Sequence, residues 1–357
     1  MFHNPELYSR ISRLIDRQIS DQHPAVRLQA SSRLNRLWEI DRDGFWERLN
    51  SIVENERNIG VLKFFANGIF GKILHHAPAR ISEASVRLYD RFKYAPEKRS
   101  ILTEGLSNTF CILWISYDEA KPKDIIDTWI DDFLEYKEEL HNIIQNLRSA
   151  LIYGLGETEN DTEKNRQIRT KSTLLAQNIL SSISETLENI NIESTLTDTQ
   201  KETFKQSHRL LDSLCNQLRF AIAPINDNSR KQYSLYSKKV FLEECEALLF
   251  MIGKSATPNT LYTLLQIIEV LVPANPEKCF DLMTLSLTSG GKTYNFQHES
   301  LGLNIVVKLI GFFLADHKYI FEDEVRRKSL IDCLDLFVNS GWPAAQRLLY
   351  DLPDLLK

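Results

Sequence analysis

The sequence predicts an all-α protein in which helical hairpins pack side by side. Apolar residues recur at three- and four-residue intervals through most of the 357-residue chain, which is the pattern of helices with one buried face. Prolines and short polar turns interrupt these segments after roughly 12–20 residues, as expected of a helical repeat array. Sustained alternation of apolar and polar residues, the pattern of a half-buried strand, does not occur. These three observations predict an array of helices without a sheet.

The first hairpin is expected within residues 1–40. A helix over residues 6–19 has one apolar stripe, and a second helix begins at Pro24, whose fixed φ and missing N–H suit a first turn. We expect this second helix to continue to Ile40. The buried stripes consist of Leu7, Ile11, Leu14 and Ile15 in the first helix and of Val26, Ala30, Leu34 and Leu37 in the second.

Further helices are expected up to residue 153, separated by polar turns. Asp43 is expected to cap the helix that carries Trp46, because an aspartate side chain accepts a hydrogen bond from an amide of the first turn. The segment Lys121-Pro122-Lys123-Asp124 is expected to interrupt the array. The predicted helical segments are 46–52, 61–74, 82–92 (after Pro78), 96–114, 125–134 and 140–152.

Two changes in composition divide the chain into three predicted domains. Residues 154–161 and 224–229 read as loops, so HEAT-like helical repeats are expected over 1–153, a long helical hairpin or irregular repeat over 154–223, and C-terminal repeats with a capping helix over 224–357. The middle domain contains two long apolar stripes, and Thr199 with Glu202 matches a capping box before the second. The expected C-terminal helices are 240–252, 258–271, 277–287, 301–314, 325–338 and 343–356.

Residues 21–40 suggest which kind of repeat this is. They follow the pattern Asp-x-x-Pro-x-Val-Arg-x-x-Ala-x-x-x-Leu, from Asp21 through Arg27 to Leu34, which resembles the second helix of a HEAT repeat. The resemblance implies an α-solenoid, because one helical hairpin cannot bury its apolar face without stacked neighbours. It also implies that Arg27 forms bonds within or between repeats.

A second resemblance covers residues 290–357. The segments Gly290-Gly291-Lys292-Thr293 and Gly341-Trp342-Pro343-Ala344 lie in a region that looks like the C-terminal helical region of large bacterial multidomain NTPase proteins. Several proteins with such tails act in anti-phage defence, where the repeat region senses or assembles. The resemblance implies a sensing or assembly role and assigns no catalytic residue. The chain would be a separately encoded repeat subunit or the C-terminal portion of a longer protein.

Charge and cysteine content bound the environment of the protein. The formal net charge is −5, yet residues 1–100 carry 17 Lys/Arg against 12 Asp/Glu, so the first hundred residues are at +5 and the remainder at −10. The five cysteines include no close pair, which favours a reducing compartment. The N-terminus does not resemble a signal peptide, and every apolar run is shorter than the ~20 residues that span a bilayer. We therefore expect a cytoplasmic protein without membrane contact.

Motifs associated with catalysis are incomplete in this chain. Ser289–Thr293 ends like a phosphate-binding loop, but Ser286 occupies the position of the first required glycine, and the segment is expected to join two helices. His298-Glu299 begins like a zinc-protease helix, but Gly302 replaces the second histidine. The sequence predicts no enzymatic activity, no cofactor and no metal site.

The candidate partner-binding residues lie in the first hairpin. Arginine suits phosphate, so this basic hairpin could follow a nucleic-acid backbone, although the same arginines could serve repeat stacking or a solvated surface. The leading hypothesis is a non-enzymatic recognition or scaffold module for a protein partner, in a bacterial anti-phage defence system. A nucleic-acid-binding HEAT-like module is the alternative, an enzyme acting on DNA bases is the third, and the oligomeric state stays open. The candidate residues are Arg10, Arg13, Arg17, Arg33, Arg36 and Trp38.

Overall fold

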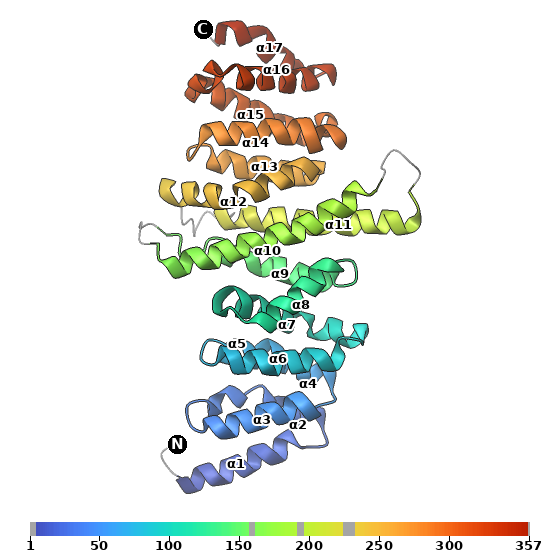
Figure 1. Cartoon of the computed structure of the whole chain (residues 1–357), viewed down its shortest axis with the longest axis vertical. Helices are drawn as coiled ribbons and strands as arrows, with labels where there is room; N and C mark the ends of the chain where they lie inside the picture. The colour runs from blue at the N-terminus through green and yellow to red at the C-terminus, as the bar shows by residue number, and fades with distance from the viewer. Residues whose placement is uncertain (1–4, 157–160, 191–195, 224–232, 356–357) are drawn as a thin grey trace. The chain divides into compact units, whose positions relative to one another are not determined.

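The computed structural model describes residues 5–156, 161–190, 196–223 and 233–355, and its regular elements are helices (Figure 1). These four ranges contain no strand, so the predicted all-α class is confirmed. The contacts between residues divide the chain into two compact units, residues 1–143 and residues 144–357. Residues 154–223, predicted as a separate domain, therefore belong to the second unit. The predicted break at 224–229 lies outside the described residues.

In the first unit, each helix packs against helices that lie near it in the chain. Thus α1 contacts α2 and α3, α2 contacts α4, α3 contacts α6, and α4 contacts α7. The α-helices are α1 (Pro5–Ile19), α2 (Pro24–Ser31), α3 (Arg42–Asn55), α4 (Ile59–Phe65), α5 (Gly71–Ile73), α6 (Pro78–Phe92), α7 (Pro96–Tyr117) and α8 (Ala120–Asp131), and α9 (Lys137–Ala150) crosses into the second unit. Two other helical turns are the 3₁₀ helix η1 (Leu34–Leu37) and the π-helix η2 (Ala66–Phe70).

The second helix of the first hairpin is shorter than predicted. It ends at Ser31, and the chain continues through a turn into the 3₁₀ helix η1. The Ser32 hydroxyl donates a hydrogen bond to the Gln29 carbonyl at 3.3 Å, which shows how serine side chains compete for helical carbonyls and favour a helix end. Leu34 and Leu37 are nevertheless buried as predicted.

The starts of α3 and α8 also differ from the prediction. The cap of α3 is Asp41 and not Asp43, because the Asp41 side chain accepts the Gly44 N–H at 2.8 Å. The predicted break at 121–124 lies in the first turn of α8, where Pro122 costs no hydrogen bond because the first amides of a helix have no intrahelical partner.

Gly105 allows α7 to approach the π-helix η2 closely. A β-carbon built on Gly105 would lie 2.9 Å from the carbonyl carbon of Ala66 and 2.9 Å from the amide nitrogen of Asn67. Backbone atoms cannot rotate away as a flexible side chain can, so a larger residue would have to separate the two helices.

Substitution of Gly105 by alanine is expected to lower the free energy of unfolding by roughly 1–3 kcal/mol, because of this overpacking. Gly71→Ala in α5 is the matched control, since a β-carbon there meets nothing within 4 Å. It is expected to be neutral or stabilising by up to roughly 1 kcal/mol. Urea denaturation followed by circular dichroism measures both, and equal values for the two variants would contradict the close contact.

The second unit repeats the same packing of each helix on its neighbours. Here α10 contacts α11 and α12, α11 contacts α13, α12 contacts α14, and α13 contacts α15. The two long helices therefore pack onto the helices that follow them, which favours a long repeat over a protruding hairpin. The helices are α10 (Glu163–Glu188), α11 (Asp198–Ile222), α12 (Leu235–Ser255), α13 (Pro258–Leu271), α14 (Pro276–Ser286), α15 (Ser300–Asp316), α16 (Glu324–Asn339) and α17 (Pro343–Leu355).

The capping box of α11 lies two residues before its predicted position. Thr197 is the N-cap, its hydroxyl accepts the Gln200 N–H at 3.2 Å, and the Gln200 side chain accepts the Thr197 N–H at 2.9 Å. Two backbone amides at the start of the helix, those of Thr197 and Gln200, thereby gain hydrogen-bond partners.

Candidate partner-binding pocket

A mostly apolar pocket of about 360 Å³ lies between α1 and the segment formed by α2 and η1. We call it the hairpin pocket. α1 and α2 form the first hairpin, which lies at the N-terminal end of the first unit (Figure 1). The lining residues are Tyr8, Ile11, Leu14, Ile15 and Gln18 of α1 and, opposite them, Gln29, Ala30, Arg33, Leu34, Arg36, Leu37 and Ile40.

The apolar stripe of α1 is only partly covered. Leu14 has 53% of its surface exposed, and Ile11 and Ile15 beside it are half-buried. In α1 no side chain that the structure describes is fully buried, although the sequence predicts this stripe as core. Since α2 ends at Ser31, it is too short to cover α1 along its whole length.

Hydrogen bonds to α3 fix the orientation of α1. The Tyr8 hydroxyl, at the pocket wall, donates to the carboxylate of Asp41. Burial and this carboxylate raise the pKa of Tyr8 to about 12, so the hydroxyl stays protonated and donates at neutral pH. Arg48 of α3 donates to both carboxylate oxygens of Asp16, at 2.7 and 3.1 Å, and to the Ser12 hydroxyl at 2.6 Å. The half-open stripe therefore belongs to a helix that is held in place.

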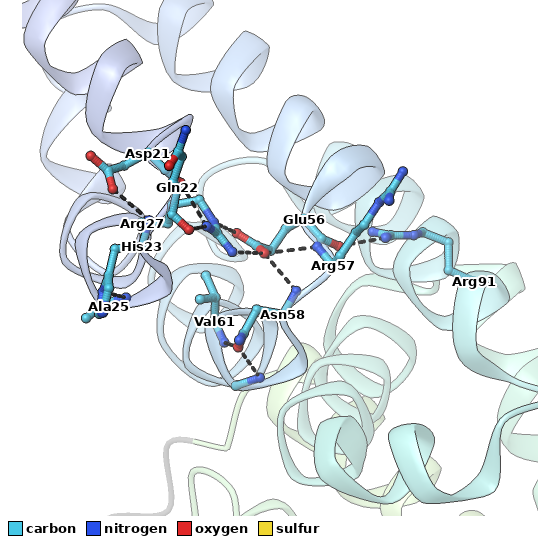
Figure 2. A network of polar contacts seen from close by, with 11 residues as sticks. Asp21, Gln22, His23, Ala25, Arg27, Glu56, Arg57, Asn58, Val61 and Arg91 are labelled. Carbon is cyan, nitrogen blue, oxygen red and sulfur yellow. Dashed lines mark hydrogen bonds and ion pairs between the residues drawn. The ribbon is translucent and has the colours of Figure 1, made fainter.

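A second network fixes α2 and thereby the opposite wall (Figure 2). The Arg27 guanidinium donates to the two carboxylate oxygens of Glu56 at 2.7 and 2.9 Å, and to the Asp21 and Gln22 carbonyls at 2.8 and 3.0 Å. Arg91 of α6 donates to the Glu56 carbonyl at 2.7 Å. The expectation that Arg27 forms bonds within or between hairpins is confirmed.

The charge state of Glu56 depends on this network. Burial alone would raise the pKa of its carboxyl, but the hydrogen bonds from Arg27 and from the Asn58 and Arg57 amides, at 2.8 and 2.9 Å, hold the pKa below its ordinary value. Arg27 and Glu56 also line a second pocket of about 350 Å³, next to Arg57. Arg27 and Glu56 bind one another, so their charged groups are already paired. This second pocket is therefore a weaker candidate for partner binding than the hairpin pocket.

The structure separates the six predicted partner-binding residues into three groups. Arg33 and Arg36 line the hairpin pocket and are exposed. Arg10, Arg13 and Arg17 are exposed on α1 but do not line the pocket. Because Arg10 precedes Leu14 by four residues and Arg17 follows it by three, both lie beside Leu14 on the helix surface.

Trp38 is a core residue and not a surface residue. It is 8% exposed, and its ring packs edge-on against Phe45 and Trp46 with centroid distances of 5.6 and 5.9 Å. The Arg42 guanidinium lies 5.0 Å from the centre of the Trp38 ring. Burial among other aromatic rings leaves the Trp38 ring little surface for a partner, so the structure gives no support to its predicted partner contact.

The Ser289–Thr293 segment does not have the geometry of a phosphate-binding loop. Residues Leu287–Gly291 form a π-helix that continues α14, so the Ser289–Thr293 segment is not a loop between a strand and a helix as phosphate binding requires. Burial raises the pKa of Cys111, Cys245, Cys279 and Cys333 to about 12, so these thiols are protonated at neutral pH. Within the described ranges no cluster of three or more His, Cys, Asp or Glu side chains could hold a metal ion.

Comparison of the chain with models of known families, with curated proteins and with solved structures gives no match. None of the helices in the described part of the chain combines the length and the apolar character that crossing a membrane requires.

Proposed function

We propose that the protein is a non-enzymatic recognition module, an α-solenoid of HEAT-like hairpins, that binds a protein partner through the hairpin pocket. The observation that carries this proposal is the open stripe of α1. Leu14 is exposed beside a mostly apolar pocket whose two walls are held by hydrogen bonds. Contiguous exposed apolar surface on a fixed scaffold is typical of a protein-binding site.

A recurrent polar contact supports the HEAT-like repeat. Asp21 accepts the His23 N–H at 2.7 Å, and Glu56 accepts the Asn58 N–H at 2.8 Å, where His23 and Asn58 are the N-caps of α2 and α4. Glu56 lies between α3 and α4, which we take as the second hairpin, and so occupies there the position of Asp21 in the first. Arg27 binds this carboxylate of the following hairpin, which would link successive repeats.

Arg99 of α7 makes the same kinds of contact as Arg27, one to an upstream carbonyl and others to carboxylates further along the chain. It follows the proline that starts its helix by three residues, as Arg27 does, and it donates to the Lys93 carbonyl at 3.0 Å, six residues upstream. Its guanidinium also binds Glu139 and Glu135, both at 2.8 Å, toward the next helical pair. Recurrence of one contact at corresponding helix positions is what a stacked repeat predicts.

The biological setting of the proposal comes from the sequence. The resemblance of residues 290–357 to repeat regions of anti-phage defence proteins supports a sensing or assembly role in such a system. The cysteines Cys111, Cys215, Cys245, Cys279 and Cys333 are free and buried, which is compatible with a reducing, cytoplasmic compartment.

The test is affinity capture with a charge placed in the pocket. Tagged wild-type chain, Leu14→Glu and Leu235→Glu are each used to capture proteins from extracts of the cells that encode the chain, followed by quantitative mass spectrometry. Leu235 of α12 is the matched control, because it is 50% exposed but lies in the other unit. We expect at least one protein captured in a fixed ratio by wild type and Leu235→Glu and lost with Leu14→Glu.

Capture that is insensitive to Leu14 would overturn the proposal, and co-purification of nucleic acid alone would favour the alternative. That alternative has a distinct signature, because phosphate binding by Arg10, Arg17, Arg33 and Arg36 would fall steeply with salt and would not need Leu14. Circular dichroism melting of each variant confirms folding, since surface substitutions usually change stability by less than about 0.5 kcal/mol.

A further inference from the structure

We propose that the occupant of the hairpin pocket is an amphipathic helix of a protein partner, with carboxylates on both sides of its apolar face. This inference rests on the proposed function and names the class of its partner. It excludes a nucleic acid and a second copy of this chain as the occupant.

The composition of the pocket favours a helix. Buried Leu34 and Leu37 line one side, and Ile11, Leu14 and Ile15 of α1 line the other. Partner helices dock in such grooves through apolar anchors at positions i, i+3 or i+4, and i+7. The alternative of strand addition requires a sheet edge, and the described residues contain no strand.

The exposure of Leu14 favours an elongated partner over a compact ligand. At about 360 Å³ the pocket lies within the range that encloses drug-sized molecules, roughly 300–1,000 Å³, so its volume alone does not separate the two. Leu14 in the pocket wall is largely exposed, so an elongated partner covers apolar surface that a ligand enclosed in the pocket would leave in water. Anchors in a pocket surrounded by weaker contacts are typical of protein interfaces.

The arginines around the pocket favour a partner helix with acidic residues on both sides of its apolar face. Exposed arginines border the apolar surface on both sides, Arg10 and Arg17 beside Leu14 and Arg33 and Arg36 at the opposite wall. The acidic side chains within residues 8–40 do not neutralise them fully. Asp16 binds Arg48, Asp21 binds the His23 amide, and Glu39 is exposed.

These arginines act on specificity more than on affinity. Exposed ion pairs contribute little each, but like charges placed against this surface repel and wrong partners are rejected. A helix with glutamates beside its apolar stripe is therefore favoured over an otherwise identical helix with lysines.

The experiment uses three labelled peptides of about 18 residues, roughly five helical turns, and the full chain. One has leucines at i, i+4, i+7 and i+11 with flanking glutamates, the second replaces each glutamate by lysine, and the third is a scrambled form of the first without a stripe. Fluorescence anisotropy is expected to show binding of the acidic amphipathic peptide, with at least about tenfold weaker binding of the lysine peptide at low salt.

Variants of the chain assign the binding to this surface. Leu14→Glu is expected to weaken binding of the acidic peptide by at least about tenfold, and the control Leu235→Glu to leave it unchanged. The double variant Arg33→Glu/Arg36→Glu leaves Arg10 and Arg17 in place, so it is expected to abolish the preference by strengthening binding of the lysine peptide, which loss of folding could not produce.

Four results would overturn the inference. Three of them are equal binding of the acidic and lysine peptides, equal binding of the scrambled peptide, and a dimer in analytical ultracentrifugation that Leu14→Glu dissociates. If none of the peptides binds while affinity capture still yields a protein dependent on Leu14, this inference fails and the proposed function stands. If affinity capture yields no such protein, the proposed function itself fails.

Discussion

Replacement of Arg169 by alanine is expected to lower the free energy of unfolding by roughly 3–5 kcal/mol, because it removes the main counter-charge of two mostly buried carboxylates, Asp161 and Glu244. The Arg169 side chain is fully buried. Its guanidinium donates to both oxygens of Asp161 at 2.8 and 2.6 Å, to both oxygens of Glu244 at 2.7 and 2.8 Å, and to the Tyr153 carbonyl at 2.9 Å. Five charge-assisted donors are lost at once, and Asp161 and Glu244 are left facing one another.

Arg166→Ala is the control for this prediction. Its side chain is 56% exposed and lies 3.7 Å from the same Asp161, so its removal is expected to change stability by less than about 1 kcal/mol. Urea denaturation followed by circular dichroism measures both variants. A loss with Arg169→Ala no larger than that of the control would show that the buried cluster does not hold α10 to α12.

The helices could be predicted from the sequence because periodicity and proline position are local properties. The stripe of α10 from Ile168 to Leu187 is buried as its spacing predicts, and prolines such as Pro78, Pro96 and Pro258 begin helices. These features act through the chain near the residue itself, whatever packs against it later.

The features that escaped prediction depend on distant residues or on close competition between backbone states. The π-helix η2 lies against Gly105, almost forty positions later, which no local pattern encodes. α2 ends at Ser31 although its apolar pattern continues, and Asp41 caps α3 although Asp43 is the same residue type two positions later. In each case two backbone conformations of similar energy compete, and local sequence does not determine which one forms.

The difference between local features and features that depend on distant residues also explains which parts of the candidate site could be predicted. The basic character of Arg33 and Arg36 is readable from composition, and the structure places both at the hairpin pocket. The exposure of Leu14 is not readable from α1, since its stripe looks like any buried stripe and only the length of α2 leaves it open. Trp38 shows the converse, because its burial depends on α3 residues that a surface-based interpretation of the first hairpin ignores.

Loss of the Glu56 carboxylate is expected to have the second large effect on stability. Glu56→Gln keeps the size of the side chain but points an amide donor at the Arg27 guanidinium, so roughly 3–5 kcal/mol of stability should be lost at neutral pH. The folded-state pKa of Glu56 is depressed, so its contribution is present above its ordinary pKa of 4.5 and is lost as the pH falls through the lower folded-state value. The difference in unfolding free energy between wild type and Glu56→Gln should therefore narrow as the pH is lowered below 4.5.

Glu54→Gln provides the matched control two positions away. Glu54 pairs with Arg87 at 3.0 Å, but both side chains are about half exposed, so the variant should lie within about 1 kcal/mol of wild type at every pH. A double-mutant cycle with Arg27→Met separates the pair from its surroundings, because once Glu56 is neutral the arginine has lost its main partner and the two losses should fall short of additivity by at least about 1 kcal/mol. Additive losses, or a gap to wild type that does not change with pH, would show that Arg27 and Glu56 act independently and that no arginine–carboxylate contact joins the first hairpin to the second.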